Sequence, residues 1–171
     1  MIHVYHGDGK GKTTAAIGLS IRAAGSGKRV VFAQFLKGSD TSELSILMKI
    51  ENIEVCRNEK DFGFLFQMTE EEKKELVKMH NQTLRHVIQL VKEKKVDMVV
   101  LDEITYPYED KLLDCKALEQ FIETLGEEVE LVLTGRNPTA FFLDKADYIT
   151  NMTCVRHPFE KNQPARKGIE F

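Results

Sequence analysis

Cysteine is scarce in this sequence and tryptophan is absent, since 171 residues contain three cysteines and no tryptophan. Cys56, Cys115 and Cys154 are far apart and odd in number. A disulfide framework needs an even set of cysteines, and the common zinc sites need closely spaced pairs such as Cys-x-x-Cys. The sequence fits neither class, and we expect three reduced, half-buried cysteines that contribute to packing.

An excess of positive charge is also missing, because 24 lysines and arginines stand against 27 acidic residues and the net charge is -3. Proteins that bind nucleic acids more often carry a net positive charge or a basic stripe, so we expect no nucleic-acid partner. No apolar run is long enough to span a membrane, and the start lacks the basic and apolar regions of a signal peptide. We therefore expect a cytoplasmic protein with no membrane partner.

The remaining composition is that of an ordinary globular protein, 42% hydrophobic and 30% charged. A chain of 171 residues is long enough for one sizeable core and too short for two domains of ordinary size. We therefore expect a single domain that comprises residues 1–171.

A glycine-rich segment near the N-terminus, residues 4–14, is the strongest functional signal. A strand pattern leads into three glycines within five residues and then into a helical pattern that begins near Lys12. Such a loop and the first turn of the helix direct N–H groups and a positive dipole end at an anion. The pattern is a phosphate-binding loop, or Walker A motif, in which Lys12 supplies charge and Thr13 a Mg²⁺ ligand. The residues expected to bind ATP are Gly7, Asp8, Gly9, Lys10, Gly11, Lys12, Thr13 and Thr14.

The loop departs from the usual spacing at its first position, where His6 replaces the expected glycine. A bulkier residue changes the entry to the loop, so the sequence predicts a variant and not the common ATPase or GTPase type. The alternative is a glycine-rich turn that binds nothing. The order of strand, glycines, Lys-Thr and helix disfavours that alternative.

Strand patterns alternate with helical patterns along the chain. Thr69 and Glu72 form a capping-box pattern at the start of the longest helix, and Asp114 is expected to cap another helix. This alternation predicts an α/β fold, a mostly parallel, doubly wound sheet with helices on both faces and ligands beyond the carboxyl ends of its strands. We expect strands at residues 2–6, 29–35, 53–56, 96–101, 129–133 and 147–152, and helices at 12–24, 42–50, 69–95, 114–125 and 138–145.

Charged residues follow two of the predicted buried strands. Asp102 and Glu103 end the strand at 96–101, and beside a phosphate loop they indicate the magnesium side of a nucleotide site. Because neighbouring strand residues alternate in direction, one carboxylate is expected to face the metal and the other a supporting partner. Arg136 follows the strand at 129–133, where it can pair with phosphate or with an acidic neighbour. The residues expected to be catalytic are Lys12, Glu103 and Arg136.

These residues leave the reaction at ATP open. Phosphoryl transfer, hydrolysis that drives a conformational change, and displacement at the ribose C5′ with loss of the whole triphosphate can all use such a site. The aromatic segment 62–66 is open in the same way. It can fill the core or form a hydrophobic lid over a flat apolar ligand.

Six short motifs follow one another along the chain: GDGKGKTTAA (7–16), QFLKG (34–38), VLDEITY (100–106), TGRN (134–137), ADY (146–148) and KGIEF (167–171). Together they resemble the ATP:corrinoid adenosyltransferases of the CobA/BtuR type. The resemblance covers the chain from end to end. It implies a P-loop NTPase-like (RecA-like) domain that takes ATP as co-substrate and a corrinoid, cobalamin or cobyrinate diamide, as substrate.

The reaction that the resemblance implies is attack of Co(I) of the reduced corrinoid on C5′ of MgATP, with release of triphosphate, in adenosylcobalamin biosynthesis or salvage. It implies Thr13 and Glu103 as Mg²⁺ ligands with Asp102 in support. It also implies that Phe62 and Phe64 lie against the corrinoid, although the family has tryptophan at the second position. A homodimer and a flavoprotein reductant are further implications. Many members have an additional segment before the first strand, so closure over the corrinoid is expected to differ here.

Two other classes of function remain open at this point. A P-loop ATPase or ATP-dependent regulator would use Glu103 to orient water and would release ADP. A nucleotide-binding interaction module would bind ATP without reaction, and the complete metal site disfavours that reading.

Overall fold

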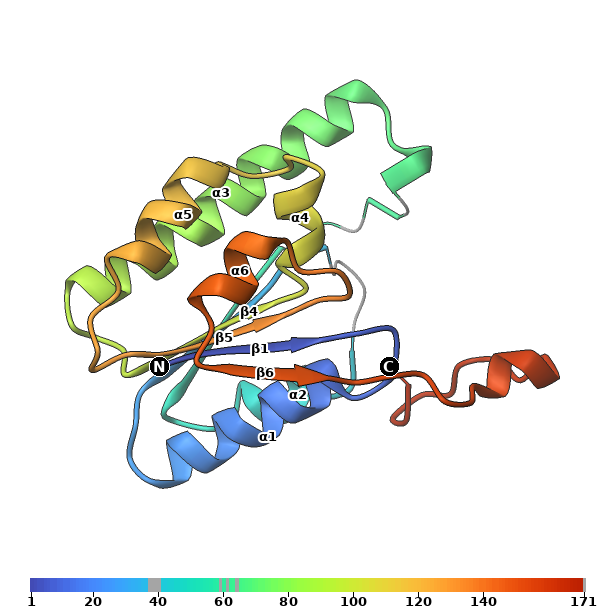
Figure 1. Ribbon diagram of the computed structural model, residues 1–171, viewed down its shortest axis with the longest axis horizontal. Coiled ribbons are helices and arrows are strands. Elements are labelled where there is room, and N and C mark those ends of the chain that lie inside the picture. Colours follow the sequence, from blue (N-terminus) through green and yellow to red (C-terminus); the bar gives the residue numbers. More distant parts are fainter. Residues whose placement is uncertain (37–40, 59, 61, 64, 171) are drawn as a thin grey trace.

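A parallel sheet forms the centre of the computed structural model, which describes residues 1–36, 41–58, 60, 62–63 and 65–170 (Figure 1). All five strand pairings are parallel, and the strand order is β3-β2-β4-β5-β1-β6. This architecture confirms the predicted α/β fold. The strands are β1 (Ile2–His6), β2 (Val30–Gln34), β3 (Ile53–Arg57), β4 (Met98–Asp102), β5 (Glu130–Thr134) and β6 (Tyr148–Asn151).

Helices cover both faces of the sheet (Figure 1). One face carries α1 (Lys12–Gly25) and the short α2 (Leu44–Leu47), and the other carries α3 (Glu70–Lys92), α4 (Thr105–Glu109), α5 (Cys115–Glu123) and α6 (Ala140–Lys145). Every residue of β4 is buried, and its side chains alternate between the two layers. Val99 belongs to the apolar cluster under α3 and α5, and Val100 to the cluster under α1.

The helix starts follow the capping patterns of the sequence. The Thr69 hydroxyl accepts from the Glu72 amide at 3.2 Å, and the Glu72 carboxylate accepts from the Thr69 amide at 2.8 Å. Asp114 accepts from the Ala117 amide at 3.0 Å at the start of α5. Both predicted caps are therefore confirmed, because they depend on residues three positions apart and not on the rest of the fold.

Short elements differ from the prediction. The helix expected at residues 42–50 is limited to Leu44–Leu47, while α4 and the 3-10 turns η1 (Leu65–Gln67) and η2 (Pro158–Lys161) were not predicted. Helix α4 contains Pro107, which hides the helical pattern, although a proline in the first turn removes no intrahelical hydrogen bond.

The three cysteines are free and half-buried, as predicted. Over the part of the chain that the structure describes, no helix is both long and apolar enough to cross a membrane.

Candidate active site

The phosphate loop starts one residue later than the usual motif would place it. His6 is the last residue of β1, paired with Asn151 of β6, and its carbonyl accepts from the Met152 amide at 2.8 Å. The position that is normally the first glycine is therefore part of the sheet. The loop begins at Gly7, whose φ of 107° lies in the region that favours glycine.

The first half of the loop packs closely against the end of β6. A Cβ at Gly7 or at Gly9 would lie 2.5 Å from the Met152 carbonyl oxygen. The Gly9 amide donates to that oxygen at 2.7 Å, and the Gly7 amide donates to the carbonyl of Arg136 at 3.1 Å. These bonds fix the loop between the ends of β5 and β6, so the groups at the start of α1 face the pocket.

Lys12 is the first residue of α1, and its side chain is folded back into the loop. Lys12 is 8% exposed, and its ammonium donates to the carbonyls of Gly7 and Gly9, both at 2.7 Å. Burial lowers the pKa of Lys12, while the nearby carboxylate of Glu103 acts in the opposite direction. The charge is thus already placed at the centre of the loop.

Thr134, at the end of β5, bonds to both acidic residues of the site, to the carboxylate of Asp102 and to the backbone amide of Glu103. Its hydroxyl donates to Asp102 at 2.7 Å and accepts from the Glu103 amide at 2.9 Å. Asp102 is fully buried and also accepts from the Gln34 amide group at 3.3 Å. Glu103 has a φ of 59°, an uncommon value for a residue with a side chain, and its side chain lines the pocket.

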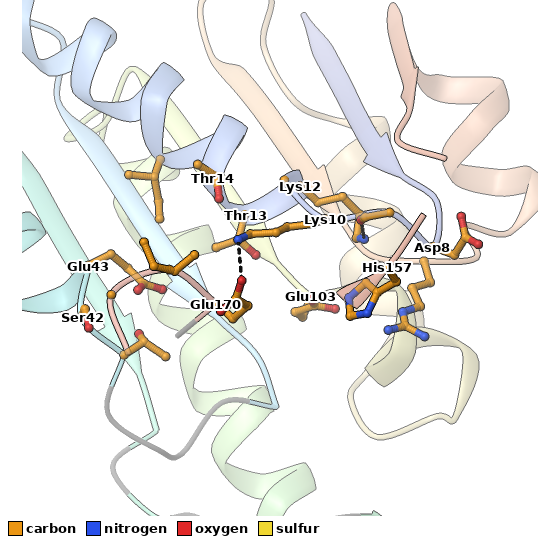
Figure 2. Close-up of a pocket in the computed structure, with 17 residues that line it drawn as sticks. Asp8, Lys10, Lys12, Thr13, Thr14, Ser42, Glu43, Glu103, His157 and Glu170 are labelled. Carbon is orange, nitrogen blue, oxygen red and sulfur yellow. Dashed lines mark hydrogen bonds and ion pairs between the residues drawn. The ribbon is translucent and has the colours of Figure 1, made fainter. Parts of the chain in front are cut away.

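The loop, Glu103 and Arg136 line one pocket of about 820 Å³ at the carboxyl edge of the sheet (Figure 2). Of the residues predicted from sequence, the pocket brings together those from Asp8 to Thr14 with Glu103 and Arg136. Gly7 and Asp102 are not in the lining, but Gly7 bonds to the lining residue Arg136, and Asp102 bonds to Thr134, which also bonds to Glu103. Phe62 is not among the described residues of the lining, and Phe64 lies outside the described residues. The prediction that these two rings cover a corrinoid stays a prediction.

The sequence predicts no role for several of the residues that line the pocket. They come from the segment before α2 and from the C-terminal tail, and they are Thr41, Ser42, Glu43, His157, Gly168, Ile169 and Glu170. The tail shows no periodicity, so nothing in it predicts where it lies. Its closing motif was one signal, because it is among the motifs on which the resemblance rests. Figure 2 shows Glu170 in direct contact with the Lys10 ammonium, which donates to it at 3.3 Å.

The donor atoms of the pocket fit a magnesium ion. Thr13 and Glu103 line the same pocket and offer hydroxyl and carboxylate oxygens, the hard ligands that Mg²⁺ prefers. Asp102 adds a buried negative charge behind them. Lys10, Lys12 and Arg136 line the same pocket, and their positive charges suit an anionic nucleotide.

Comparison with known sequences places this arrangement in a family. A sequence profile described as ATP:corrinoid adenosyltransferase BtuR/CobO/CobP matches residues 1–171. The chain belongs to this family. The "Corrinoid adenosyltransferase CobA" of Salmonella typhimurium LT2 is 32% identical over 174 residues, which cover 100% of this chain and 85% of that protein. The "Corrinoid adenosyltransferase" of Escherichia coli K12 is 30% identical with the same coverage, and that of Pseudomonas aeruginosa PAO1 is 29% identical over 98% of this chain and 82% of its own.

Because the chain belongs to the corrinoid adenosyltransferase family, it is classed as a transferase. A solved structure, the KaiC-like protein PH0186 of Pyrococcus horikoshii OT3, is similar with a TM-score of 0.55. It is 17% identical and covers 89% of this chain and 71% of its own, so the likeness concerns the fold. It confirms the P-loop NTPase-like fold class of this adenosyltransferase-family chain.

Proposed function

We propose that this chain, acting as one domain, transfers the 5′-deoxyadenosyl group of ATP to Co(I) of a reduced corrinoid. The electron pair of Co(I) forms the Co–C bond, the C5′–O bond breaks, and its electrons leave with triphosphate. The observation that supports this best is the convergence of Lys12, the amides at the start of α1 and Arg136 on one pocket in a chain of this family. Such a pocket can hold a leaving polyphosphate.

The cationic groups act most strongly where charge grows during the reaction. Negative charge accumulates on the triphosphate as the C5′–O bond breaks, so donors aimed at it stabilise the transition state more than the bound substrate. Lys12 is held in place by hydrogen bonds to two carbonyls of the loop. Little reorientation of this charge is therefore needed when the reaction occurs.

Magnesium belongs to the proposal, with Thr13 and Glu103 as the residues that would hold it. When bound, the ion would neutralise phosphate oxygens. The Thr134 hydroxyl fixes the Asp102 carboxylate by donating to it, and it fixes the Glu103 backbone by accepting from the Glu103 amide. Asp102 therefore supports the site through its buried charge and its bond to Thr134.

The corrinoid side of the proposal depends on features outside the nucleotide pocket. We propose that Phe62 and Phe64 contact the corrinoid. We also propose that a flavoprotein reduces the corrinoid and that the active state is a homodimer. The pathway is the biosynthesis or salvage of adenosylcobalamin, with cobalamin or cobyrinate diamide as acceptor.

An anaerobic assay with MgATP and chemically reduced cobalamin tests the proposal. We expect loss of the Co(I) absorbance and formation of adenosylcobalamin. Lys12→Ala should lower the rate by about 100-fold or more, because it removes a charge that stabilises the leaving group. Lys28→Ala, in the exposed turn after α1, is the matched control. A wild-type protein that alkylates Co(I) no faster than Lys12→Ala would contradict the proposal.

ATP hydrolysis is the second candidate, and it is favoured by one observation. The Glu103 carboxylate lines the same pocket as the loop, where it can orient a water molecule towards the terminal phosphate. In that case ADP would form without any corrinoid. Measurement of ADP in the absence of corrinoid, with Glu103→Gln as the comparison, distinguishes this candidate from adenosyl transfer.

A further inference from the structure

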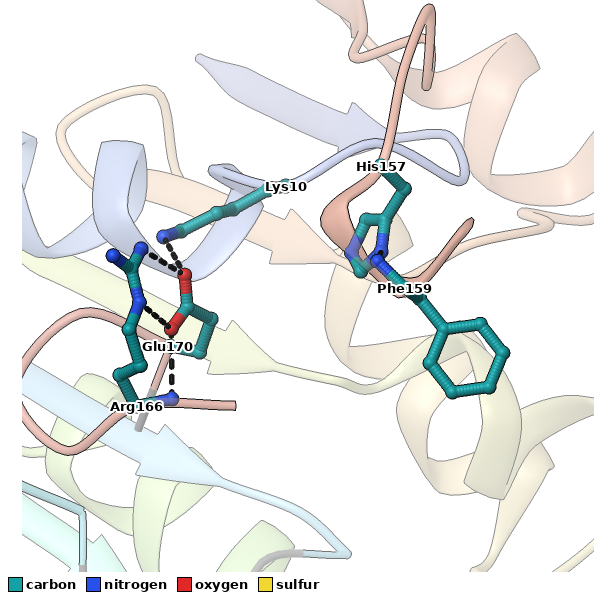
Figure 3. A network of polar contacts seen from close by, with 5 residues as sticks. All are labelled: Lys10, His157, Phe159, Arg166 and Glu170. Carbon is teal, nitrogen blue, oxygen red and sulfur yellow. Dashed lines mark hydrogen bonds and ion pairs between the residues drawn. The ribbon is translucent and has the colours of Figure 1, made fainter. Parts of the chain in front are cut away.

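The C-terminal tail contacts the phosphate loop at two separate places. Directly after β6, the Cys154 amide donates to the Asp8 carboxylate at 3.0 Å, and this bond is the main cause of the lowered pKa of Asp8. Sixteen positions later, Glu170 accepts from the Lys10 ammonium at 3.3 Å. The tail therefore leaves the sheet at one side of the loop and returns to it at the other (Figures 1 and 3).

Glu170 is the centre of the second contact (Figure 3). One of its oxygens accepts from Lys10 at 3.3 Å and from the Arg166 guanidinium at 3.0 Å, and the other accepts from the Arg166 amide at 2.8 Å and Nε at 3.2 Å. Arg166 is the main cause that lowers the pKa of Glu170 to about 2. Glu170 is thus ionised at neutral pH and fully engaged by cations, which suits an anchor and not a proton donor.

The anchor also completes the pocket. Gly168, Ile169 and Glu170 line it together with the loop, although they are exposed like the rest of the tail, with Ile169 at 54% and Val155 at 93%. Lys10 is one of the loop residues expected to bind the phosphates, and its ammonium is held by the tail. One carboxylate between two cations leaves a local excess of positive charge beside the anion site.

We propose that Glu170 is a positioning residue of the nucleotide site: it fastens the end of the tail to Lys10, so that the tail forms one wall around the bound nucleotide. This rests on the proposed use of the pocket for ATP. Glu170 acts through Lys10 and Arg166 and touches no reacting atom. Its loss should weaken nucleotide binding without changing the chemistry.

Steady-state kinetics of Glu170→Gln test the anchor. We expect the KM for ATP to rise about three- to tenfold, in keeping with the modest strength of exposed ion pairs, with kcat and the KM for cobalamin nearly unchanged. Glu170→Asp should recover part of the affinity. Glu160→Gln, in the exposed turn η2, is the matched control. An unchanged KM for ATP would overturn the anchor, and a lower KM would show instead that the carboxylate competes with phosphate.

A Lys10→Gln background shows whether Glu170 acts through Lys10. In that background, Glu170→Gln should raise the KM for ATP by less than about twofold more, because the effects of two residues in one interaction are not additive. Full additivity would contradict the proposed route. Calorimetric binding of MgATP gives the same comparison without turnover. Wild-type protein that binds MgATP and shows the Glu170 effect, yet does not alkylate Co(I), would retain the anchor and refute only the proposed function.

A second, independent cluster lies between β3 and α3. Glu54 and Cys56 are two positions apart in β3 and therefore point to the same face of the strand. His86 of α3 lies beside them. Their ligand atoms lie within 4.8 Å of one another. The imidazole nitrogen of His86 is 2.6 Å from a Glu54 oxygen, and the Cys56 thiol donates to that oxygen at 3.6 Å.

The three side chains form a ligand set for zinc-like ions. Sulfur, imidazole nitrogen and carboxylate oxygen are the three donor types that Zn²⁺ uses, and three protein ligands leave one position for water. Glu54 and His86 are each 49% exposed, so an ion can reach them. We infer that Glu54, Cys56 and His86 form a binding site for a divalent transition metal such as Zn²⁺, which would fasten β3 to α3. Binding releases the thiol proton to solvent.

Titration with Co²⁺, followed by competition with Zn²⁺, tests this site on the complete chain. We expect one Co²⁺ per chain with a thiolate-to-metal charge-transfer absorption, displaced by Zn²⁺ and lost in Cys56→Ser and His86→Asn. Cys154→Ser, another half-buried cysteine, should leave the absorption unchanged. Absence of the charge-transfer band, or its persistence in Cys56→Ser, would overturn the assignment.

Discussion

At the scale of single residues, Thr134 organises the acidic half of the site. One hydroxyl serves both carboxyl-bearing residues, as donor to Asp102 and as acceptor for the amide of Glu103. The hydrogen bond from the Glu103 amide fixes the backbone of Glu103, whose φ of 59° is uncommon for a residue with a side chain. In the proposed function, the position of Glu103 as a metal ligand therefore depends on Thr134, which would not contact the metal.

We expect Thr134→Val to lower the free energy of unfolding by about 1–3 kcal/mol, because it leaves a buried carboxylate without one of its donors. It should also lower adenosyl transfer through the changed position of Glu103. Urea denaturation measures the first effect, with Thr150→Val on the exposed strand β6 as the control. Equal stability of Thr134→Val and wild type would contradict this role.

Phe62 allows a test of the corrinoid side. Its ring lies 4.7 Å from the Lys60 ammonium, measured to the ring centre. If the ring displaces the lower ligand of the corrinoid and so eases reduction, Phe62→Ala should impair turnover from Co(II) more than from chemically reduced Co(I). Parallel assays with the two starting states measure this difference. Equal losses would count against the assignment.

At the scale of elements, the loop from β1 to α1 depends on close contact with the end of β6. Gly9→Ala would place a Cβ 2.5 Å from the Met152 carbonyl oxygen. Since the contact is with backbone, the loop must move, and we expect weaker ATP binding together with lower stability. Calorimetric titration and thermal unfolding measure the two effects.

Gly18→Ala is the matched control for the loop glycine. A Cβ at Gly18, inside α1, meets nothing within 4 Å. Alanine is favoured over glycine in a helix interior by about 1 kcal/mol, so this variant should be more stable than wild type and bind ATP equally well. If Gly9→Ala behaved like Gly18→Ala, close packing of the loop on β6 would not matter.

The link between the start of β2 and the start of β4 predicts a dependence of stability on pH. Arg29 donates to Asp97 through its amide at 2.8 Å, Nε at 3.0 Å and Nη2 at 2.7 Å, and these bonds lower the pKa of Asp97 to about 2. Because the pKa is lower in the folded state than its ordinary value of about 4, the ionised group stabilises the fold above that pH. This contribution is lost as the pH falls towards 2.

Asp97→Asn should therefore be less stable than wild type at pH 7, and the difference should shrink steadily below about pH 4. Denaturant unfolding across this range provides the measurement, with Asp144→Asn on the exposed side of α6 as the control. A difference between wild type and Asp97→Asn that stays constant down to the lowest pH would exclude the ion pair as its cause.

Elements with strong local patterns could be predicted from the sequence, whereas features set by distant contacts could not. The caps of α3 and α5 and the buried strand β4 depend on neighbouring residues. The path of the tail depends on Lys10 and Glu170, which are 160 positions apart. The positive φ of Glu103 has no local signal either, and the Glu103 amide bonds to Thr134, which is 31 positions away.

At the scale of the whole molecule, the parallel sheet explains why the predicted site residues meet. Strands β1, β4 and β5 are neighbours in the sheet order, and their carboxyl ends carry the loop, Glu103 and Arg136. This convergence follows from the α/β alternation and could be predicted. The part of the pocket formed by the tail could not be predicted, because it depends on contacts between residues far apart in the sequence.

If the pocket holds triphosphate as a leaving group, phosphorus NMR of the reaction products will detect that molecule intact. Wild-type protein, MgATP and Co(I) cobalamin are mixed without oxygen, and adenosylcobalamin is measured in the same sample. We expect one intact triphosphate for each adenosylcobalamin formed. ADP and phosphate without alkylation of the corrinoid would contradict it.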